Sequence, residues 1–234
     1  MTSFTSQGPL VVIAGGSSAA GIAVAASLVA AGMRVVTVGS DAGRITAAAN
    51  LTGGAVPFSC DLADPDAVSA LVAKIHTDFG PVDGLVHLVG GWRGGGGITA
   101  QSDADWDFLH TSVLSTLRNT TRALYEDLAA SPEGRLAIVS STSVTAPTAG
   151  NASYASVKAA AETWVQSVAQ GFGSSTAPEQ SAAVVLVVKA LVDDTMRARS
   201  PERSFPGFTD VAVLAQAVTS LFGKPGLNGA RIIL

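Results

Sequence analysis

The sequence predicts an α/β fold: a doubly wound parallel sheet with helices on both faces, formed by a single domain over residues 1–234. Three observations support this prediction. Apolar runs of strand length alternate with helix-like segments about six times, as in a parallel sheet covered by helices. The runs are apolar at nearly every position, which is typical of strands buried on both faces. No linker or shift in composition divides the 234 residues.

The first half of the chain is predicted to alternate between strands and helices. Its expected strands are the apolar runs at residues 10–14, 34–38 and 84–89. A helix of small residues is expected over residues 20–31, and it ends at Gly32. Another helix begins at Asp64, an N-cap residue followed by a proline at the first helical position.

The second half continues the alternation after a loop at residues 90–97, which contain six glycines. One long helix is expected over residues 102–130, because Ser102 and Asp105 resemble a capping box and apolar residues then follow along one face. The remaining predicted elements are strands at 135–139, 182–188 and 230–234, and helices at 154–172 and 211–222.

Composition and charge exclude several classes of protein. Charged residues make up 14% and hydrophobic residues 47% of the chain, which is too apolar for a disordered protein. A net charge of −4 without basic clusters predicts no nucleic-acid partner. Cys60 is the single cysteine, so no internal disulfide is expected. The three histidines are far apart in the sequence and predict no metal site.

The first charged residue is Arg34, so the stretch before it is long enough to raise the question of a membrane segment. Gly15 and Gly16 interrupt this stretch, and no basic region precedes it as in a secretory signal. We therefore interpret it as a buried strand, a glycine-rich turn and a helix. No membrane partner and a cytoplasmic location are expected.

The turn between the first strand and the first helix is the first candidate site. Its candidate binding residues are Gly15, Ser17, Ser18, Ala19 and Gly21. Glycines let the backbone approach a phosphate, and the helix that follows offers free N–H groups and the positive end of its dipole. A tight turn without a ligand is the alternative. In a strand–turn–helix unit of an α/β chain, this turn predicts dinucleotide binding.

The end of the second strand bears on which dinucleotide is bound. Proteins that bind NAD usually carry an acid there for the ribose 2′-hydroxyl. This strand instead ends in Gly39 and Ser40, with Asp41 one or two positions later and Arg44 on the next turn. We therefore predict NADP as the preferred cofactor, with NAD also possible; Ser40 and Arg44 would provide the contacts. The alternative for Asp41 is that it only caps the following helix.

Three polar residues form the candidate catalytic set. Ser141 follows a predicted strand, and Tyr154 and Lys158 lie one helical turn apart on the same face of a helix. A nearby cation can lower the pKa of a phenol from about 10 toward the working pH of an acid–base catalyst. The alternative is a partly buried tyrosine beside a surface lysine.

Taken together, these motifs resemble those of the short-chain dehydrogenase/reductase family, in its classical form with a Rossmann-like fold. The resemblance extends from about residue 10 to the C-terminus. Residues 14–21 resemble the family's cofactor turn, and Asp61 and Leu62 resemble its adenine-contacting segment. The residues from Tyr154 to Lys158 match the Tyr-x-x-x-Lys signature, and Ser141 precedes Tyr154 by the family spacing.

The resemblance implies an NADP-preferring oxidoreductase that interconverts a carbonyl and a secondary alcohol by hydride transfer. Tyr154 would be the general acid/base, Ser141 would hold the substrate oxygen, and Lys158 would bind the nicotinamide ribose and lower the tyrosine pKa. Val89 and Gly90 would contact the cofactor. A small-molecule substrate and a homodimer or homotetramer are also implied, with the helices at 102–130 and 154–172 pairing across a two-fold axis.

Several positions depart from the family pattern. Ala14 and Ala19 replace a threonine and a glycine of the cofactor turn, and Lys189-Ala190 stands where Pro-Gly is usual. Residues 87–90, His-Leu-Val-Gly, keep only the glycine of an Asn-Asn-Ala-Gly segment.

A further departure concerns the asparagine that, in the family, holds a helix kink and a proton-relay water. That position falls on Val113, or on Ser112 if the alignment shifts by one. These departures support an alternative function: a catalytically weak dinucleotide-binding protein, either a sensor or a non-catalytic subunit. Segments 91–98, 143–151 and 192–208 are expected to line the substrate site, and the sequence does not identify the substrate.

Overall fold

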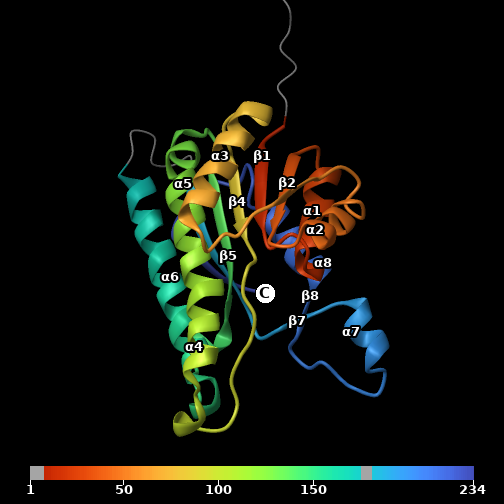
Figure 1. Ribbon diagram of the computed structural model, residues 1–234, viewed down its shortest axis with the longest axis vertical. Helices are drawn as coiled ribbons and strands as arrows, with labels where there is room; N and C mark the ends of the chain where they lie inside the picture. Colours follow the sequence, from red (N-terminus) through yellow and green to blue (C-terminus); the bar gives the residue numbers. More distant parts are fainter. Residues whose placement is uncertain (1–7, 175–180) are drawn as a thin grey trace, which may run out of the picture.

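Seven strands, parallel throughout, form the central sheet (Figure 1). The computed structural model describes residues 8–174 and 181–234. In chain order the strands are β1 (Leu10–Ala14), β2 (Arg34–Gly39), β3 (Val56–Ser59), β4 (Gly84–His87), β5 (Arg135–Ser141), β6 (Ala182–Val188) and β9 (Arg231–Ile233). Their order across the sheet is β3-β2-β1-β4-β5-β6-β9, and every neighbouring pair is parallel. This order confirms the predicted doubly wound fold.

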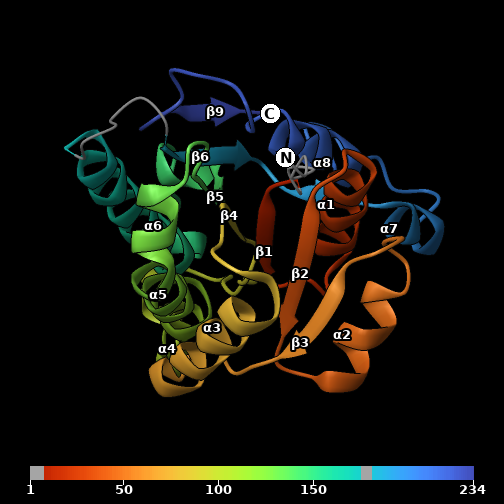
Figure 2. The ribbon, with the colours of Figure 1, turned by 90° about the horizontal axis from the view of Figure 1, so that it is seen from above.

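Helices cover both faces of the sheet, as Figure 2 shows from above. On one face lie α3 (Pro65–Phe79), α4 (Asp103–Leu109), α5 (Thr116–Ala130) and α6 (Ala152–Gly173). On the other face lie α1 (Ala19–Ala30), α2 (Ala42–Ala49) and α8 (Val211–Thr219). A short helix, α7 (Asp194–Arg199), and a two-stranded ribbon of β7 (Leu191–Val192) and β8 (Thr209–Asp210) lie beyond the carboxyl ends of the sheet.

The strand β1 shows why its sequence is apolar at every position. Leu10, Val12 and Ala14 belong to the core beneath α3, α5 and α6, whereas Val11 and Ile13 belong to the core beneath α1 and α8. Successive strand residues point to opposite faces, so a strand buried on both faces has no position for a polar side chain. Winding reverses between β1 and β4, and ligands of such sheets bind outside the carboxyl ends of the strands at that point.

The sequence did not predict β3. Its four residues, Val-Pro-Phe-Ser, include Pro57, which cannot donate a hydrogen bond. The strand forms nonetheless because it is the outermost strand of the sheet and pairs only with β2. An edge position relaxes the hydrogen-bonding requirement, and only the tertiary structure shows that the position is an edge.

The prediction of one continuous helix over residues 102–130 is wrong in its centre. Residues His110–Ser115 form a π-helical segment between α4 and α5. Such a wide turn adds a residue without disturbing the apolar periodicity enough to be recognised in the sequence. Val113 lies within this segment and is buried.

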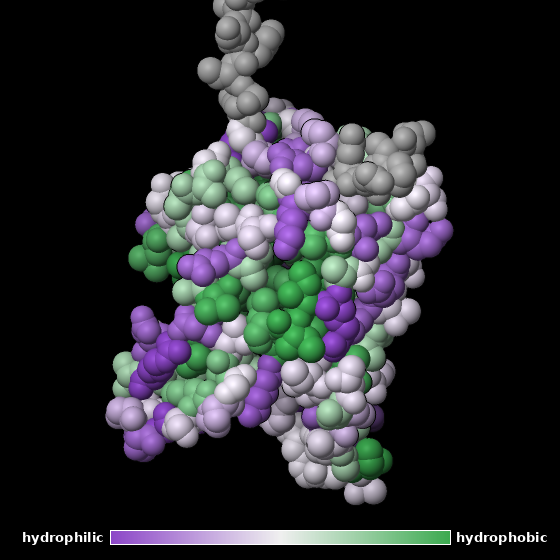
Figure 3. All heavy atoms as spheres, turned by 180° about the vertical axis from the view of Figure 1, so that it is seen from behind, coloured by the Kyte–Doolittle hydropathy of each residue, from purple (hydrophilic) through white to green (hydrophobic). Residues whose placement is uncertain are grey.

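The last strand, β9, forms the other edge of the sheet and carries Ile233, whose exposed fraction is 70%. Figure 3 shows apolar side chains gathered in the middle of the face that carries this edge. No helix among residues 8–174 and 181–234 is long and apolar enough to cross a membrane. Over the same residues, no cluster of His, Cys, Asp and Glu could hold a metal ion.

Candidate functional site

The glycine-rich turn after β1 is packed so closely that side chains would not fit at two of its positions. Gly15 has a φ of +87°, and a Cβ atom there would lie 2.9 Å from the backbone of Leu88. A Cβ atom on Gly21 would lie 2.5 Å from the carbonyl oxygen of Gly15. Ser18 caps α1 by accepting a hydrogen bond from Gly21 N at 2.9 Å. The turn therefore lies directly against the first turn of α1, with the positive end of the helix dipole beside it.

A cavity of about 620 Å³ opens in front of this turn, which is within the usual size range of ligand sites. Nine of the predicted cofactor-binding residues line it: Gly15, Ser17, Ser18, Gly39, Ser40, Asp61, Leu62, Val89 and Gly90. These residues follow β1, β2, β3 and β4, so the parallel sheet brings together segments that are far apart in the sequence.

Three other expected cofactor contacts, Ala19, Gly21 and Arg44, do not line this cavity. Arg44 does not line the cavity; its exposed side chain pairs with Asp41 at 3.7 Å. Asp41 caps α2 by accepting a hydrogen bond from Arg44 N at 2.7 Å, as the alternative interpretation of that residue states. Ala19 does not line the cavity either, although Ala20 lines the neighbouring one.

A second cavity of about 420 Å³ brings Ser141, Tyr154 and Lys158 together. It shares Leu88, Val89 and Gly90 with the first cavity. Ser141 ends β5, whereas Tyr154 and Lys158 lie in the first part of α6. The candidate catalytic set and the glycine turn therefore face one continuous cleft at the carboxyl ends of the strands.

The structure contradicts the interpretation of Lys158 as a surface residue. Only 9% of the residue is exposed, and Nζ donates a hydrogen bond to the carbonyl oxygen of Val139 at 2.8 Å. Burial lowers the pKa of Lys158 to about 8, although the negative charge of Glu162 acts in the opposite direction. Nζ lies 5.9 Å from the centre of the Tyr154 ring.

Tyr154 does not have the lowered pKa that the spacing predicts. Burial raises the pKa of the phenol, and a hydrogen bond with Ser141 opposes this only in part. The phenol is therefore protonated at neutral pH and can donate a proton. The sequence pattern places a cation nearby but does not show how deeply the tyrosine is buried.

Changing Lys158 to methionine should alter how the stability of the protein depends on pH. The folded-state pKa of about 8 lies below the ordinary value of 10.5, so the unfolded chain binds more protons between these values. Between pH 8 and pH 10.5, the free energy of unfolding of the wild type should therefore rise by on the order of 2–3 kcal/mol more than that of Lys158→Met. Urea denaturation across this range measures the difference. Parallel curves for the two proteins would contradict a buried charge.

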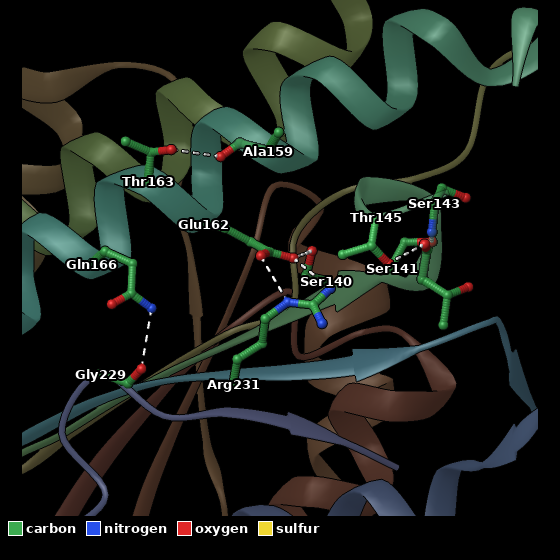
Figure 4. A network of polar contacts seen from close by, with 11 residues as sticks. Ser140, Ser141, Ser143, Thr145, Ala159, Glu162, Thr163, Gln166, Gly229 and Arg231 are labelled. Atoms are coloured by element: carbon green, nitrogen blue, oxygen red, sulfur yellow. Dashed lines mark hydrogen bonds and ion pairs between the residues drawn. The ribbon is translucent and has the colours of Figure 1, made fainter. Parts of the chain in front are cut away.

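A polar network is centred on Glu162, which lies one helical turn after Lys158 in α6 (Figure 4). Ser140 Oγ donates to Glu162 Oε1 at 2.5 Å, and Arg231 Nε pairs with Glu162 Oε2 at 3.0 Å. The network joins β5, α6 and β9 through one carboxylate. It holds the negative charge of Glu162 near Lys158, where that charge favours the ammonium form.

Val113, rather than Ser112, lies on the side of the helix that faces Lys158. It is 3% exposed and lines, together with Lys158 and His87, a cavity of only about 10 Å³. Ser112 instead lines the larger cavity. The apolar Val113 side chain supplies none of the polar partners that a bound water needs.

The sequence interpretation missed several residues that line the cleft. Phe108, Thr111, Ser112 and Thr116 contribute to the larger cavity from the long helix. The run of small hydroxyl residues at Thr111, Ser112, Ser115 and Thr116 within the predicted helix was the available indication. Of the segments expected to line the substrate site, Gly91, Trp92 and Ser143 line the second cavity. No residue of 192–208 lines it; residues 188–191 do.

Comparisons with known proteins agree with this architecture. The family model of short chain dehydrogenases matches residues 9–201. A short chain dehydrogenase of Pseudocercospora fijiensis (strain CIRAD86) is 30% identical over 168 residues, which are 70% of this chain and 54% of that protein. The 3-oxoacyl-(acyl-carrier-protein) reductase of Escherichia coli (strain K12) is 27% identical over 65% of this chain and 63% of that protein. Both matches span less than two thirds of the relative's own length.

Two solved structures share the fold. A short-chain type dehydrogenase/reductase from Mycobacterium ulcerans has a TM-score of 0.86 and 20% identity, covering 97% of this chain and 88% of that one. ElxO with NADP bound has a TM-score of 0.86 and 16% identity, covering 97% and 96%. From the family-model match, together with this fold, we conclude that the chain belongs to the short-chain dehydrogenase/reductase family of NAD(P)-dependent oxidoreductases.

Proposed function

We propose that this protein is an NADP-preferring oxidoreductase that interconverts a carbonyl and a secondary alcohol, with Tyr154 as the general acid/base. The observation that carries the proposal is the continuous cleft. It joins the cavity of the glycine turn to the cavity that contains Ser141, Tyr154 and Lys158. A dinucleotide and a small substrate would lie end to end in such a cleft.

The residues of the larger cavity fit a nicotinamide dinucleotide. Glycines at positions 15 and 21 let the turn pack closely against neighbouring backbone at the start of α1. The free N–H groups and the positive dipole end of that helix would favour a phosphate there. Ser17 and Ser18 offer hydroxyl groups beside it, and Asp61 and Leu62 would contact the adenine end. When bound, the nicotinamide supplies or accepts the hydride.

The residues of the second cavity supply the proton chemistry. In the direction of reduction, the Tyr154 hydroxyl would donate its proton to the oxygen of the carbonyl. Its raised pKa means that this proton is present at neutral pH. The Ser141 hydroxyl would donate a hydrogen bond to the same oxygen. Lys158 is largely charged at neutral pH and would stabilise the phenolate that remains.

The names of relatives support the reaction class without identifying the substrate. One relative is a 3-oxoacyl-(acyl-carrier-protein) reductase, and one solved structure is an L-sorbose reductase from Gluconobacter frateurii complexed with NADPH and L-sorbose. Both names describe the reduction of a carbonyl compound. We propose a small carbonyl or alcohol substrate for this chain, and a homodimer or homotetramer as its assembly.

A second candidate function is a catalytically weak dinucleotide-binding protein. The packing of Val113 favours it, because the small cavity that Val113 lines with Lys158 and His87 has a volume of only about 10 Å³ and the valine offers no polar group to it. A proton consumed at Tyr154 would then have to be replaced by another route. Binding of NADPH without turnover of any tested carbonyl compound would support this alternative.

The cofactor preference is tested by Gly39→Asp. NADPH should bind the wild type more tightly than NADH, because Gly39 and Ser40 carry no carboxylate to repel a 2′-phosphate and the Asp41 side chain caps α2 instead of lining the cavity. Aspartate should reverse the order through like-charge repulsion and a new hydrogen bond to the ribose. A Cβ atom at Gly39 would lie 3.3 Å from Ile45 Cδ1 and 3.4 Å from Ser17 Oγ, so small side-chain shifts make room for it.

The matched control is Gly39→Asn, which has the same shape without the charge. Both variants and the wild type are titrated with NADPH and with NADH, and binding is followed by tryptophan fluorescence. The affinities for the two cofactors are then compared within each protein. Asparagine should leave NADPH preferred. Tighter binding of NADH to the unmodified protein would contradict the proposed preference.

A further inference from the structure

His87 is a buried ionisable group beside the cleft that the proposed chemistry does not use. It ends β4 and pairs in register with Ala14 on one side and Ile138 on the other, so it lies in the centre of the sheet. Only 4% of it is exposed. Burial and the positive charge of Lys158 lower the pKa of His87 to about 3, which keeps the imidazole neutral at physiological pH.

The imidazole makes one hydrogen bond to the long helix. His87 Nε2 and Thr116 Oγ1 are 3.0 Å apart, and Thr116 Oγ1 donates to the carbonyl oxygen of Ser112 at 2.7 Å. A threonine hydroxyl has a single hydrogen, which goes to the carbonyl because that oxygen can only accept. His87 is therefore the donor to Thr116, and the two bonds form a chain from β4 to the backbone of Ser112.

This chain of hydrogen bonds ends within the π-helical segment His110–Ser115. A π-turn departs from the regular backbone pattern and needs support from its surroundings. The segment also forms one wall of the larger cavity, because Thr111 and Ser112 line that cavity. Val113, on the same turn, packs against Gly90, where a Cβ atom would lie 3.4 Å from Val113 Cγ2.

We propose that His87 is a positioning residue: through Thr116 it holds the π-helical segment, and with it one wall of the dinucleotide cavity, at a set distance from the sheet. This inference rests on the proposed dinucleotide site for its functional consequence. His87 lies on a strand that is paired on both sides, and such core strands are the parts of a protein that open least. Its imidazole reaches the helix from there. Val113 provides no polar group for the same purpose.

Amide hydrogen exchange tests the hydrogen-bonded link without any cofactor. In His87→Leu and Thr116→Val, the amides of residues 110–116 should exchange about five- to tenfold faster, as expected for the loss of one buried hydrogen bond. Exchange in β6 should change much less. Thr116→Ser keeps the hydroxyl and should behave as the wild type.

Thr120→Val is the matched control. Thr120 is also buried in α5, but its hydroxyl donates to the carbonyl oxygens of Thr116 and Leu117 rather than to His87, and it does not line the cavity. This variant should leave exchange at residues 110–116 unchanged. Equal acceleration in Thr120→Val, or none in Thr116→Val, would overturn the proposal. If His87→Leu fails to fold, the comparison of Thr116→Val with Thr116→Ser decides the question.

Binding gives the second readout. Thr116→Val and His87→Leu should each weaken NADPH binding about five- to tenfold, and the double variant should be no weaker than either single one, because both break the same link. Additive losses would show that the residues act separately and would overturn the link. Wild-type protein that binds neither NADPH nor NADH would refute the proposed function, while hydrogen exchange would still decide whether the link exists. If amide exchange is faster in the variants but their affinity for NADPH is unchanged, the proposed role of the His87–Thr116 link at the cavity is overturned.

Discussion

Replacing Tyr154 with phenylalanine should lower the rate of NADPH-dependent reduction of a carbonyl substrate by about 10²–10⁴-fold, the usual contribution of a general acid. The Tyr154 phenol and the Ser141 hydroxyl share a hydrogen bond, and both residues line the second cavity. Phenylalanine keeps the ring and its packing but has no proton to give. Affinity for NADPH should stay close to that of the wild type, since Tyr154 does not line the larger cavity.

Tyr125→Phe is the matched control, because Tyr125 is the other of the two tyrosines in the chain. It lies in α5 with its ring stacked on Phe172, 5.4 Å between centres, and lines neither part of the cleft. Removing the Tyr125 hydroxyl should leave the turnover rate unchanged. Steady-state rates and NADPH titrations on the three proteins complete the test. Wild-type turnover in Tyr154→Phe would refute the assignment of Tyr154 as the acid.

The second large effect is expected at the glycine turn. In Gly21→Ala, the added methyl group would lie 2.5 Å from Gly15 O and 2.7 Å from Gly16 Cα, which are backbone atoms that cannot rotate away. Either α1 or the turn must shift, so NADPH binding should fall by on the order of 100-fold, or about 2.7 kcal/mol. The free energy of unfolding should also fall, by about 1–3 kcal/mol, as in other overpacked sites.

Gly43→Ala separates this effect from a general cost of adding a methyl group. Gly43 also lies in a helix, α2, but a Cβ atom there has only Asp41 Oδ1 nearby, at 3.5 Å. Alanine should stabilise that helix by about 0.5–1 kcal/mol and leave binding unchanged. Calorimetric titration with NADPH and urea denaturation give both quantities. Unchanged NADPH affinity in Gly21→Ala would show that the turn does not contact the cofactor.

Local sequence patterns were sufficient to predict the main strands, most helices and the candidate residues of the cleft. A strand buried on both faces must be apolar at every position, so β1 and β6 are evident from composition alone. The alternation of elements limits the topology to a parallel sheet. The family match over residues 9–201 agrees with the motifs at the glycine turn and at Tyr154.

The tertiary structure decided what depends on neighbours that are distant in the sequence. Burial, which no local pattern measures, raises the pKa of Tyr154 and lowers that of Lys158, whereas the spacing of the two residues predicted only a favourable cation. Arg44 could reach the cavity by sequence position, yet it pairs with Asp41 at the surface.

The same reason explains the elements that the sequence did not predict. The strand β3 tolerates Pro57 because it lies at the edge of the sheet, and the π-helical segment exists where His87 meets Thr116 from the sheet. The sequence by itself determined the fold class and the residues near the strand ends, because backbone preferences and burial patterns are local. Their mutual distances, charge states and hydrogen-bond partners arise only when the sheet brings β1, β4, β5 and α6 together.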